Sequence, residues 1–140
     1  MFKEENIPPE MKGKKQWVCY RKKEVDGKTK KFMLNPTNLT FAKANDPATW
    51  SSFLTAMKML KRKELHIDGL AFVLTGGYVF IDTDHSIDGE GNIDELSKKL
   101  LSMLPDTYAE KSCSGHGLHI IAKGKLEKNA KKRNDSLGIE

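Results

Sequence analysis

The sequence predicts an α+β fold, built mainly of antiparallel sheets with two amphipathic helices. Runs of aromatic and β-branched residues between turn residues predict several short strands. Two segments carry apolar residues at the spacing of an α-helix, and they interrupt the strands. The chain has 140 residues, 38% hydrophobic and 31% charged, a balance typical of a folded domain and not of a disordered chain.

The first two predicted strands form a hairpin. Residues 14–21, KKQWVCYR, and residues 30–36, KKFMLNP, are rich in strand-forming residues. Asp26-Gly27, between them, is a strong signal for a tight turn. We therefore expect an antiparallel pair at the start of the domain.

A helix is predicted over residues 46–63, with Asp46 as its N-cap and Pro47 in its first turn. Its apolar residues recur at helical spacing and are expected to face the core. These residues are Trp50, Phe53, Leu54, Met57 and Leu60.

Two apolar runs follow, residues 70–75 and 78–84, and Gly76-Gly77 between them predicts a second hairpin. A second helix is predicted over residues 92–105, ended by its proline. Its apolar face is expected to hold Ile93, Leu96, Leu100 and Leu104.

Residues 107–112 and 117–124 predict two more strands around a Ser/Gly turn. The domain is therefore expected to span residues 1–124. Residues 125–140 are charged and lack an apolar stripe, so they are expected to form a flexible tail.

Charge and cysteine content narrow the class of protein only a little. The formal net charge of +5 is compatible with a polyanionic partner without identifying one. Cys19 and Cys113 lie in unrelated contexts and form no C-x-x-C pair, so neither a disulfide framework nor a zinc site is predicted. No apolar leader and no run long enough to cross a membrane occur, so a cytoplasmic protein is expected.

An acidic pair ends the strand YVFIDTD. Alternation along a strand places Asp82 and Asp84 on one face with Phe80, with the two aspartates roughly 6–7 Å apart. Two carboxylates at that separation suit one or two hard divalent cations. A polar strand end in water is the simpler explanation of a bare D-x-D, so this motif alone does not establish a metal site.

A calcium loop is an alternative for the same segment. In residues 84–95, Asp84, Ser86, Asp88 and Glu95 stand at positions 1, 3, 5 and 12 of an EF-hand pattern, with Gly89 at position 6. The segment entering the loop is a predicted strand, whereas an EF-hand loop follows a helix.

A small-residue turn precedes the last predicted strand. Ser114, Gly115, His116 and Gly117 form a turn whose backbone N–H groups could hold phosphate oxygens. His119 follows at the start of the strand, where it could donate to a phosphate or be a structural histidine.

Together these blocks resemble the primase–polymerase domain of the archaeo-eukaryotic primase superfamily, in the form found at the N-terminus of phage and plasmid replication proteins. The resemblance runs through KQWVCYR, KKFMLNP, NDPATWSSFLTAM, DGLAFVLTGGYVFIDTDH and DTYAEKSCSGHGLHIIAKG, over most of residues 15–124. The order and spacing of the blocks carry it, because no single block is specific.

The resemblance implies a nucleotidyltransferase-type domain of a DNA replication protein, used in primer synthesis or extension. It implies that Asp82 and Asp84 bind Mg²⁺ or Mn²⁺ and that Ser114 and His119 contact the phosphates of an incoming nucleoside triphosphate. It further implies a DNA template and a helicase, either as a downstream domain or as a separate protein. A non-catalytic module that binds nucleic acid or protein on the same fold is the alternative.

Two departures from the family pattern matter. The family completes its metal site with a third acid on a later strand, but Glu127, Asp135 and Glu140 lie in no apolar strand context. We therefore expect the chain to end before that motif and to be inactive or weakly active alone. Relatives often carry lysine where His116 stands, so nucleotide affinity is expected to rise as the pH falls.

Basic residues after His119 are candidates for nucleic-acid contacts. Lys123 and Lys125 are the first of them, followed by further lysines in the tail. A solvated surface is the simpler interpretation. Contacts to phosphates would make binding strongly dependent on salt.

Overall fold

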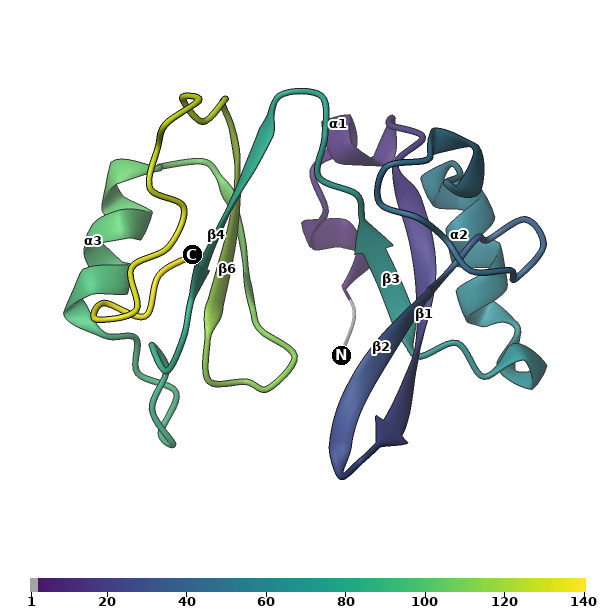
Figure 1. Cartoon of the computed structure of the whole chain (residues 1–140), viewed down its shortest axis with the longest axis horizontal. Coiled ribbons are helices and arrows are strands. Elements are labelled where there is room, and N and C mark those ends of the chain that lie inside the picture. Colours follow the sequence, from purple (N-terminus) through teal and green to yellow (C-terminus); the bar gives the residue numbers. More distant parts are fainter. Residues whose placement is uncertain (1–2) are drawn as a thin grey trace. The chain divides into compact units, whose positions relative to one another are not determined.

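A computed structural model describes residues 3–140 and divides into two compact units, Met1–Val73 and Leu74–Glu140 (Figure 1). Each unit contains one three-stranded antiparallel sheet, with strand order β2-β1-β3 in the first and β4-β6-β5 in the second. The predicted α+β class is confirmed. The expectation of a primase–polymerase-like domain over residues 1–124 stays a prediction.

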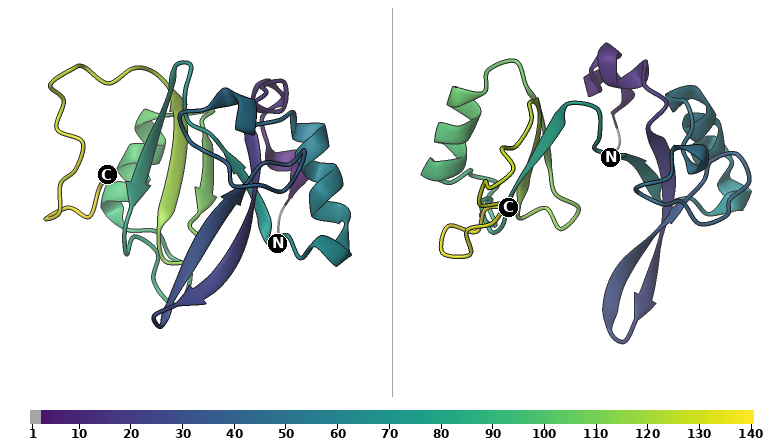
Figure 2. Two further views of the ribbon diagram at one scale, coloured as in Figure 1. Left: turned by 45° about the vertical axis from the view of Figure 1, so that its right-hand side comes forward. Right: turned by 45° about the horizontal axis from the view of Figure 1, so that its top comes forward.

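The N-terminal unit is built around the predicted hairpin. Strands β1 (Trp17–Val25) and β2 (Lys28–Leu34) pair in the register Cys19 with Leu34 through Val25 with Lys28. Asp26 and Gly27 both have positive φ, as a type I′ turn requires, and the predicted turn is confirmed. The hairpin extends beyond the rest of its unit in every view (Figure 2).

The main helix of this unit, α2, covers Phe53–Lys61, so the predicted start at Asp46 is wrong. Asp46 instead caps the short 3₁₀ helix η2 (Pro47–Thr49), and Ser52 caps α2 by accepting from the Thr55 N–H. Ser51, between the two helices, exchanges backbone hydrogen bonds with Trp17 of β1. Because Ser51 pairs with the sheet, α2 begins only after it, at Phe53.

The core of the N-terminal unit forms between α2 and the sheet. Trp17 makes edge-on ring contacts with Phe53 and Phe72, at centroid distances of 4.8 and 5.2 Å. Phe53 and Met57 are buried as predicted, but Leu54 is 65% exposed and does not belong to the core. Short helices complete the unit: η1 (Glu4–Asn6), α1 (Pro9–Lys12) and η3 (Lys63–Leu65).

The second predicted hairpin is not formed. Strand β3 (Gly69–Phe72) pairs with β1, whereas β4 (Tyr78–Thr83) pairs with β6 in the other sheet. Gly76 and Gly77 do have positive φ, but their turn lies in the connection between the two sheets. The pattern of residues predicted both strands, but it could not predict which strands they pair with.

The C-terminal unit contains β4, α3 (Glu95–Met103), β5 (Tyr108–Lys111) and β6 (Leu118–Lys123). Asp94 caps α3 by accepting from the Ser97 N–H. One sheet face is buried: Leu118, Ile120 and Ala122 of β6 point into it, and the Ser97 hydroxyl of α3 lies 3.4 Å from the Thr83 hydroxyl. The other face carries the predicted polar residues.

The last residues return to the sheet. Ile139 forms a β-bridge with Thr83 and another with Asn134. Flexibility of residues 125–140 stays a prediction, but the end of the segment has defined partners. Among residues 3–140, no helix has the length and apolar character that crossing a bilayer requires.

Candidate functional site

Strand β4 separates apolar from polar side chains by alternation. Thr83 is 2% exposed on the α3 side, whereas the Phe80 ring contacts the His119 ring on the other face at a centroid distance of 4.9 Å. Asp82 shares the face of Phe80. The predicted faces of Phe80, Asp82 and Thr83 are confirmed, but Asp84 lies beyond the end of β4, so its predicted place on the strand face is not confirmed.

His119 lies beside Asp82 because the two residues are direct partners in the β4–β6 register. Its Nε2 is 3.6 Å from Asp82 Oδ1, and its Nδ1 is 3.2 Å from Oε1 of Glu110 on β5. The imidazole is thus held between two carboxylates. Sequence reasoning missed Glu110, because only the strand register shows that it faces His119.

Asp84 lies just past the strand. Strand β4 ends at Thr83, and the backbone turns at Asp84 and His85, the latter with φ of 54°. The Asp84 N–H donates to the Gly138 carbonyl at 2.8 Å. Gly138 has φ of +61°, and a Cβ there would stand 3.3 Å from the backbone carbonyl oxygen of Asp84, so glycine suits this close approach.

A third carboxylate reaches the same strand end. Asp82 and Glu140 exchange two backbone hydrogen bonds, of 2.7 and 2.9 Å. Residues that exchange both bonds in an antiparallel pair stand directly opposite each other with side chains on one face. Sequence reasoning gave Glu140 no role, because its neighbours carry no strand pattern and its partner lies far away in the chain.

These charges act on Asp82. Burial raises the pKa of its carboxyl above the usual value, His119 opposes that shift, and Asp84 and Glu140 add to it. A cation placed among neighbouring carboxylates stabilises their ionised forms. The donor set is all carboxylate oxygen, which is the kind that Mg²⁺ and Mn²⁺ prefer.

The side chains of Asp82, Asp84 and Glu140 do not converge as a ligand set in this structure. Within residues 3–140, no group of three or more His, Cys, Asp or Glu side chains is arranged to hold a metal ion. Asp84 and Glu140 are both exposed, and Glu140 Oε2 lies 3.5 Å from Arg133 Nη1, so Glu140 would have to leave that ion pair to become a ligand. The chemistry of the donors fits a hard divalent cation.

The Ser/Gly turn lies against the same strand end. The Ile87 N–H donates to the His116 carbonyl at 3.0 Å, and a Cβ on Gly117 would stand 2.6 Å from the Thr83 carbonyl oxygen. Only glycine permits that approach. The predicted turn and the acidic strand end are therefore neighbours in the fold.

The amides of this turn already have acceptors. Gly115 donates to the Ser112 carbonyl, His116 to Ser114 Oγ, and Gly117 to Ser112 Oγ. The two serine hydroxyls are 2.9 Å apart. Ser112 was missed by sequence reasoning. The side chains of Ser114 and His116 are exposed, although the Ser114 hydroxyl already takes part in two hydrogen bonds within the turn.

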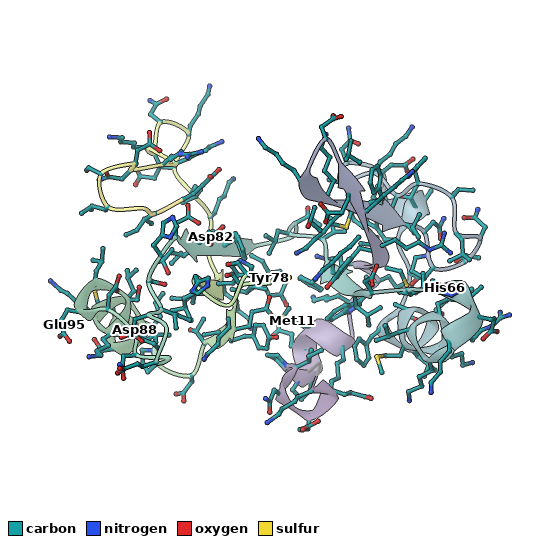
Figure 3. All side chains as sticks on the ribbon, turned by 90° about the horizontal axis from the view of Figure 1, so that it is seen from below. Met11, His66, Tyr78, Asp82, Asp88 and Glu95 are labelled. Atoms are coloured by element: carbon teal, nitrogen blue, oxygen red, sulfur yellow. The ribbon has the colours of Figure 1, made fainter. Side chains whose placement is uncertain are left out.

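The residues of the calcium-loop alternative have other partners. Asp88 accepts from the side-chain amide and the backbone N–H of Asn92 and from the backbone N–H of Glu90, and these hydrogen bonds lower its pKa. Ser86 is 2% exposed, and Glu95 pairs with Lys98. Figure 3 shows Asp88 and Glu95 beside α3 and Asp82 apart from both. The arrangement favours a self-contained loop.

Lys123 and Lys125 lie at the other end of β6. Lys123 pairs with Tyr78, four residues along the strand from the Asp82–His119 pair, which is about 13 Å. Both lysines are exposed. They are not part of the carboxylate cluster, and a role in nucleic-acid binding stays a prediction.

Comparison with known proteins supports the family predicted from the motifs. No protein-family model matches the chain. The chain is 37% identical over 131 residues to a protein named DNA primase-polymerase from Nitratiruptor phage NrS-1. The match covers 89% of this chain and 17% of that protein's length. The predicted resemblance to primase–polymerases is confirmed, and the chain corresponds to a small part of this relative.

Proposed function

We propose that this chain, a homologue of part of a phage DNA primase–polymerase, binds a divalent metal and a nucleoside triphosphate for primer synthesis or extension on DNA. One observation carries the proposal: Asp82 and His119 stand opposite each other on β4 and β6, and the Ser112–Gly117 turn packs against the end of β4 beside them. The carboxylates that could bind a metal thus lie at the same end of strands β4 and β6 as the hydroxyl and imidazole groups that could contact phosphates.

Asp82 and Asp84 would hold the metal, with Glu140 as the third carboxylate. Asp82 is fixed by the strand. Its pKa is raised first by burial and further by the charges of Asp84 and Glu140, which a bound cation would offset. A bound Mg²⁺ or Mn²⁺ would lower the pKa of an attacking 3′-hydroxyl and neutralise charge on the pyrophosphate leaving group.

Ser114, His116 and His119 would contact the triphosphate. The Ser114 hydroxyl and the His116 ring are exposed at the turn. His119, by contrast, is held on the sheet with a side chain only 18% exposed. We therefore assign orientation of the phosphates to His119 and adaptable contacts to the turn. Gly115 and Gly117 shape the turn.

Binding of a metal–nucleotide complex to the full chain can be tested by NMR. Trace Mn²⁺ added with a nucleoside triphosphate should broaden the signals of residues 82–84, 112–119 and 138–140, because an unpaired spin relaxes nearby nuclei. The variant Asp82→Asn should lose at least about tenfold in Mn²⁺–nucleotide affinity, as expected for removal of a ligand from a small donor set.

The matched control is Asp88→Asn, the same chemical change in the loop that precedes α3. We expect its metal–nucleotide affinity to equal that of the wild type, because the Asp88 oxygens are occupied by its own loop. If Asp88→Asn abolishes metal binding and Asp82→Asn does not, the metal site is the calcium loop and the proposal fails.

Catalysis is tested separately, by extension of a primed single-stranded template with Mn²⁺ and deoxynucleotides or ribonucleotides. Extension that Asp82→Asn abolishes would support the enzyme. Nucleotide binding without any extension would support the non-catalytic module on the same fold. Since the chain matches 17% of its relative, the same assay on a longer protein is the necessary comparison.

A further inference from the structure

The β1–β2 hairpin concentrates positive charge on one of its faces. Residues 21–31 contain six Lys and Arg against two Asp and Glu. Lys23 stands opposite Lys30 in the strand register, and alternation along β2 places Lys28 on the same face as Lys30. Glu24 is the only acidic residue in the sequence of either strand, and alternation places it on the opposite face. One face of the hairpin is therefore basic.

The lysines of this face are available to an outside partner. Lys23, Lys28 and Lys30 are exposed, and the ion pairs found within residues 3–140 include none of the three. The hairpin extends beyond the rest of its own unit (Figure 2), so that unit does not cover the lysines. Like charges opposite each other destabilise a strand pair, and a polyanion bound to this face would offset that cost.

An exposed aromatic ring continues the same face. Phe32 follows Lys30 by two residues on β2, so the two side chains share one face of the strand. The centroid of the Phe32 ring is 6.3 Å from that of the Phe41 ring, within the range of aromatic pairs. The Phe41 side chain is 70% exposed. The basic face is therefore joined, through Phe32, to an aromatic ring that is open to solvent.

The loop that carries Phe41 is held by hydrogen bonds on both sides of this residue. The Asn35 N–H donates to the Thr40 carbonyl at 2.8 Å, and the Ala42 N–H donates to the Met33 carbonyl of β2 at 2.9 Å. The backbone of the loop is thus tied to the hairpin, while the ring of Phe41 remains exposed. A ring on an ordered backbone loses little freedom when a ligand stacks on it, which favours binding.

We propose that the basic face of the β1–β2 hairpin and the ring of Phe41 form a binding surface for single-stranded nucleic acid. The lysines contact phosphates, and Phe41 stacks on an unpaired base. Cationic groups beside aromatic rings bind single strands with little sequence preference, because every base has a face on which a ring can stack. Only the assignment of this strand as the DNA template rests on the proposed function.

The test measures binding of a fluorescent single-stranded oligodeoxynucleotide to the full chain by anisotropy, without metal or nucleoside triphosphate. Phe41→Leu keeps an apolar side chain but removes the aromatic ring, and we expect about tenfold weaker binding. Phe41→Trp should bind within about twofold of the wild type, because an indole ring also stacks on bases. Neither variant should change the slope of log affinity against log salt, because neither removes a cation.

An abasic oligonucleotide of the same length separates stacking from charge. It keeps the phosphates but has no bases, so Phe41→Leu should bind it as tightly as the wild type does. Lys30→Ala should instead weaken binding of both oligonucleotides and lower the salt slope by about 0.7. The matched control is Leu54→Ala on α2, which removes an apolar side chain that is 65% exposed in the same unit. It should change neither the affinity nor the slope.

Two further ligands complete the set, an oligoribonucleotide and a duplex of the same sequence. Phosphates and bases are common to DNA and RNA, so both single strands should bind, and the ratio of their affinities shows which one the surface prefers. Binding of the duplex should not depend on Phe41, because its bases are already stacked and paired.

The proposal is overturned if Phe41→Leu binds the base-containing strand as tightly as the wild type does, or if it loses as much affinity for the abasic strand. Absence of oligonucleotide binding by the wild type overturns it as well. The metal–nucleotide site is measured separately by NMR, so the two failures are distinguishable. If only the metal–nucleotide site fails, the surface stands and its assignment to a template is removed.

Discussion

The two units of the molecule carry opposite excesses of charge. The N-terminal unit contains 15 Lys and Arg against 8 Asp and Glu, and the C-terminal unit contains 9 against 11. The net charge of +5 for the whole chain therefore describes neither unit. Overall charge was a weak guide to function because the basic and acidic residues that matter lie in different parts of the fold.

The positions of these charges differ as well. On the β1–β2 hairpin, Lys22 stands opposite Lys31, and Lys23 opposite Lys30, although like charges facing each other destabilise a strand pair. In the C-terminal unit, burial raises the pKa of Asp82 and the charges of Asp84 and Glu140 add to that shift. Both arrangements are typical of surfaces that bind a partner of opposite charge, an anion in one unit and a cation in the other.

The largest expected contrast between the units is in thiol reactivity. Cys19 is fully buried, with its Sγ 3.8 Å from the Ala56 carbonyl, and burial raises its pKa to about 11. Cys113 is exposed. At pH 8 we expect iodoacetamide to modify Cys113 at least about 100-fold faster than Cys19, because a buried, protonated thiol is a poor nucleophile. Peptide mass spectrometry over time measures both rates, and equal rates would mean that the N-terminal core is open.

Gly117→Ala should produce the next largest effect, on the stability of the C-terminal unit. The added Cβ would stand 2.6 Å from the Thr83 carbonyl oxygen, a backbone atom that cannot move without disturbing β4. We expect a loss of about 1–3 kcal/mol in unfolding free energy, measured by urea denaturation. Gly89→Ala is the control, because nothing lies within 4 Å of its Cβ position. Equal losses in the two variants would contradict the described approach of the turn to β4.

The lysines of the β1–β2 hairpin should contribute to binding of nucleic acid and not to the stability of the fold. The double variant Lys23→Ala/Lys30→Ala removes one opposed pair, and we expect about fivefold weaker binding of a single-stranded oligonucleotide. The slope of log affinity against log salt should fall by about 1.4, or 0.7 for each lost phosphate contact. Fluorescence anisotropy at several salt concentrations measures both.

The control for the hairpin variant is Lys58→Ala/Lys61→Ala on α2, which removes the same charge from the same unit. It should lower the affinity much less. Equal losses in both double variants would show that only the net charge of the unit matters, and the hairpin would have no special role.

The smallest expected effect is a gain in stability from Asp82→Asn. The pKa of Asp82 is higher in the folded chain than the unfolded reference, so above both values the ionised group opposes folding, and this cost disappears as the pH falls through the folded pKa. Because the side chain is 34% exposed, the gain at pH 7 should stay below about 1 kcal/mol.

Urea denaturation at pH 7 and at pH 3 tests the sign of this effect. The difference between Asp82→Asn and the wild type should be present at pH 7 and absent at pH 3, where the carboxyl is protonated in both states. Glu127→Gln, an exposed carboxylate of the tail, serves as a control and should leave stability unchanged at both values. A loss of stability at pH 7 in Asp82→Asn would contradict the raised pKa.

Local features were predictable from the residues alone. The Asp26-Gly27 turn, the strands around Asp82 and His119, and the assignment of Phe80 and Thr83 to opposite faces all depend on neighbours in the chain. Turn geometry and strand alternation are set within a few residues, so a pattern in the sequence contains the information.

The partners of these elements depended on the tertiary structure. Strand β3 paired with β1 and not with β4, and the pairing of Ser51 with Trp17 set the start of α2. Glu110 faces His119 from the neighbouring strand β5, and Glu140 reaches Asp82 from a distant segment. Register and strand order are decided by which apolar faces are buried together, an energy shared over the whole sheet. Amino-acid order therefore predicted the chemical groups of the site, and only folding decided which carboxylates surround them.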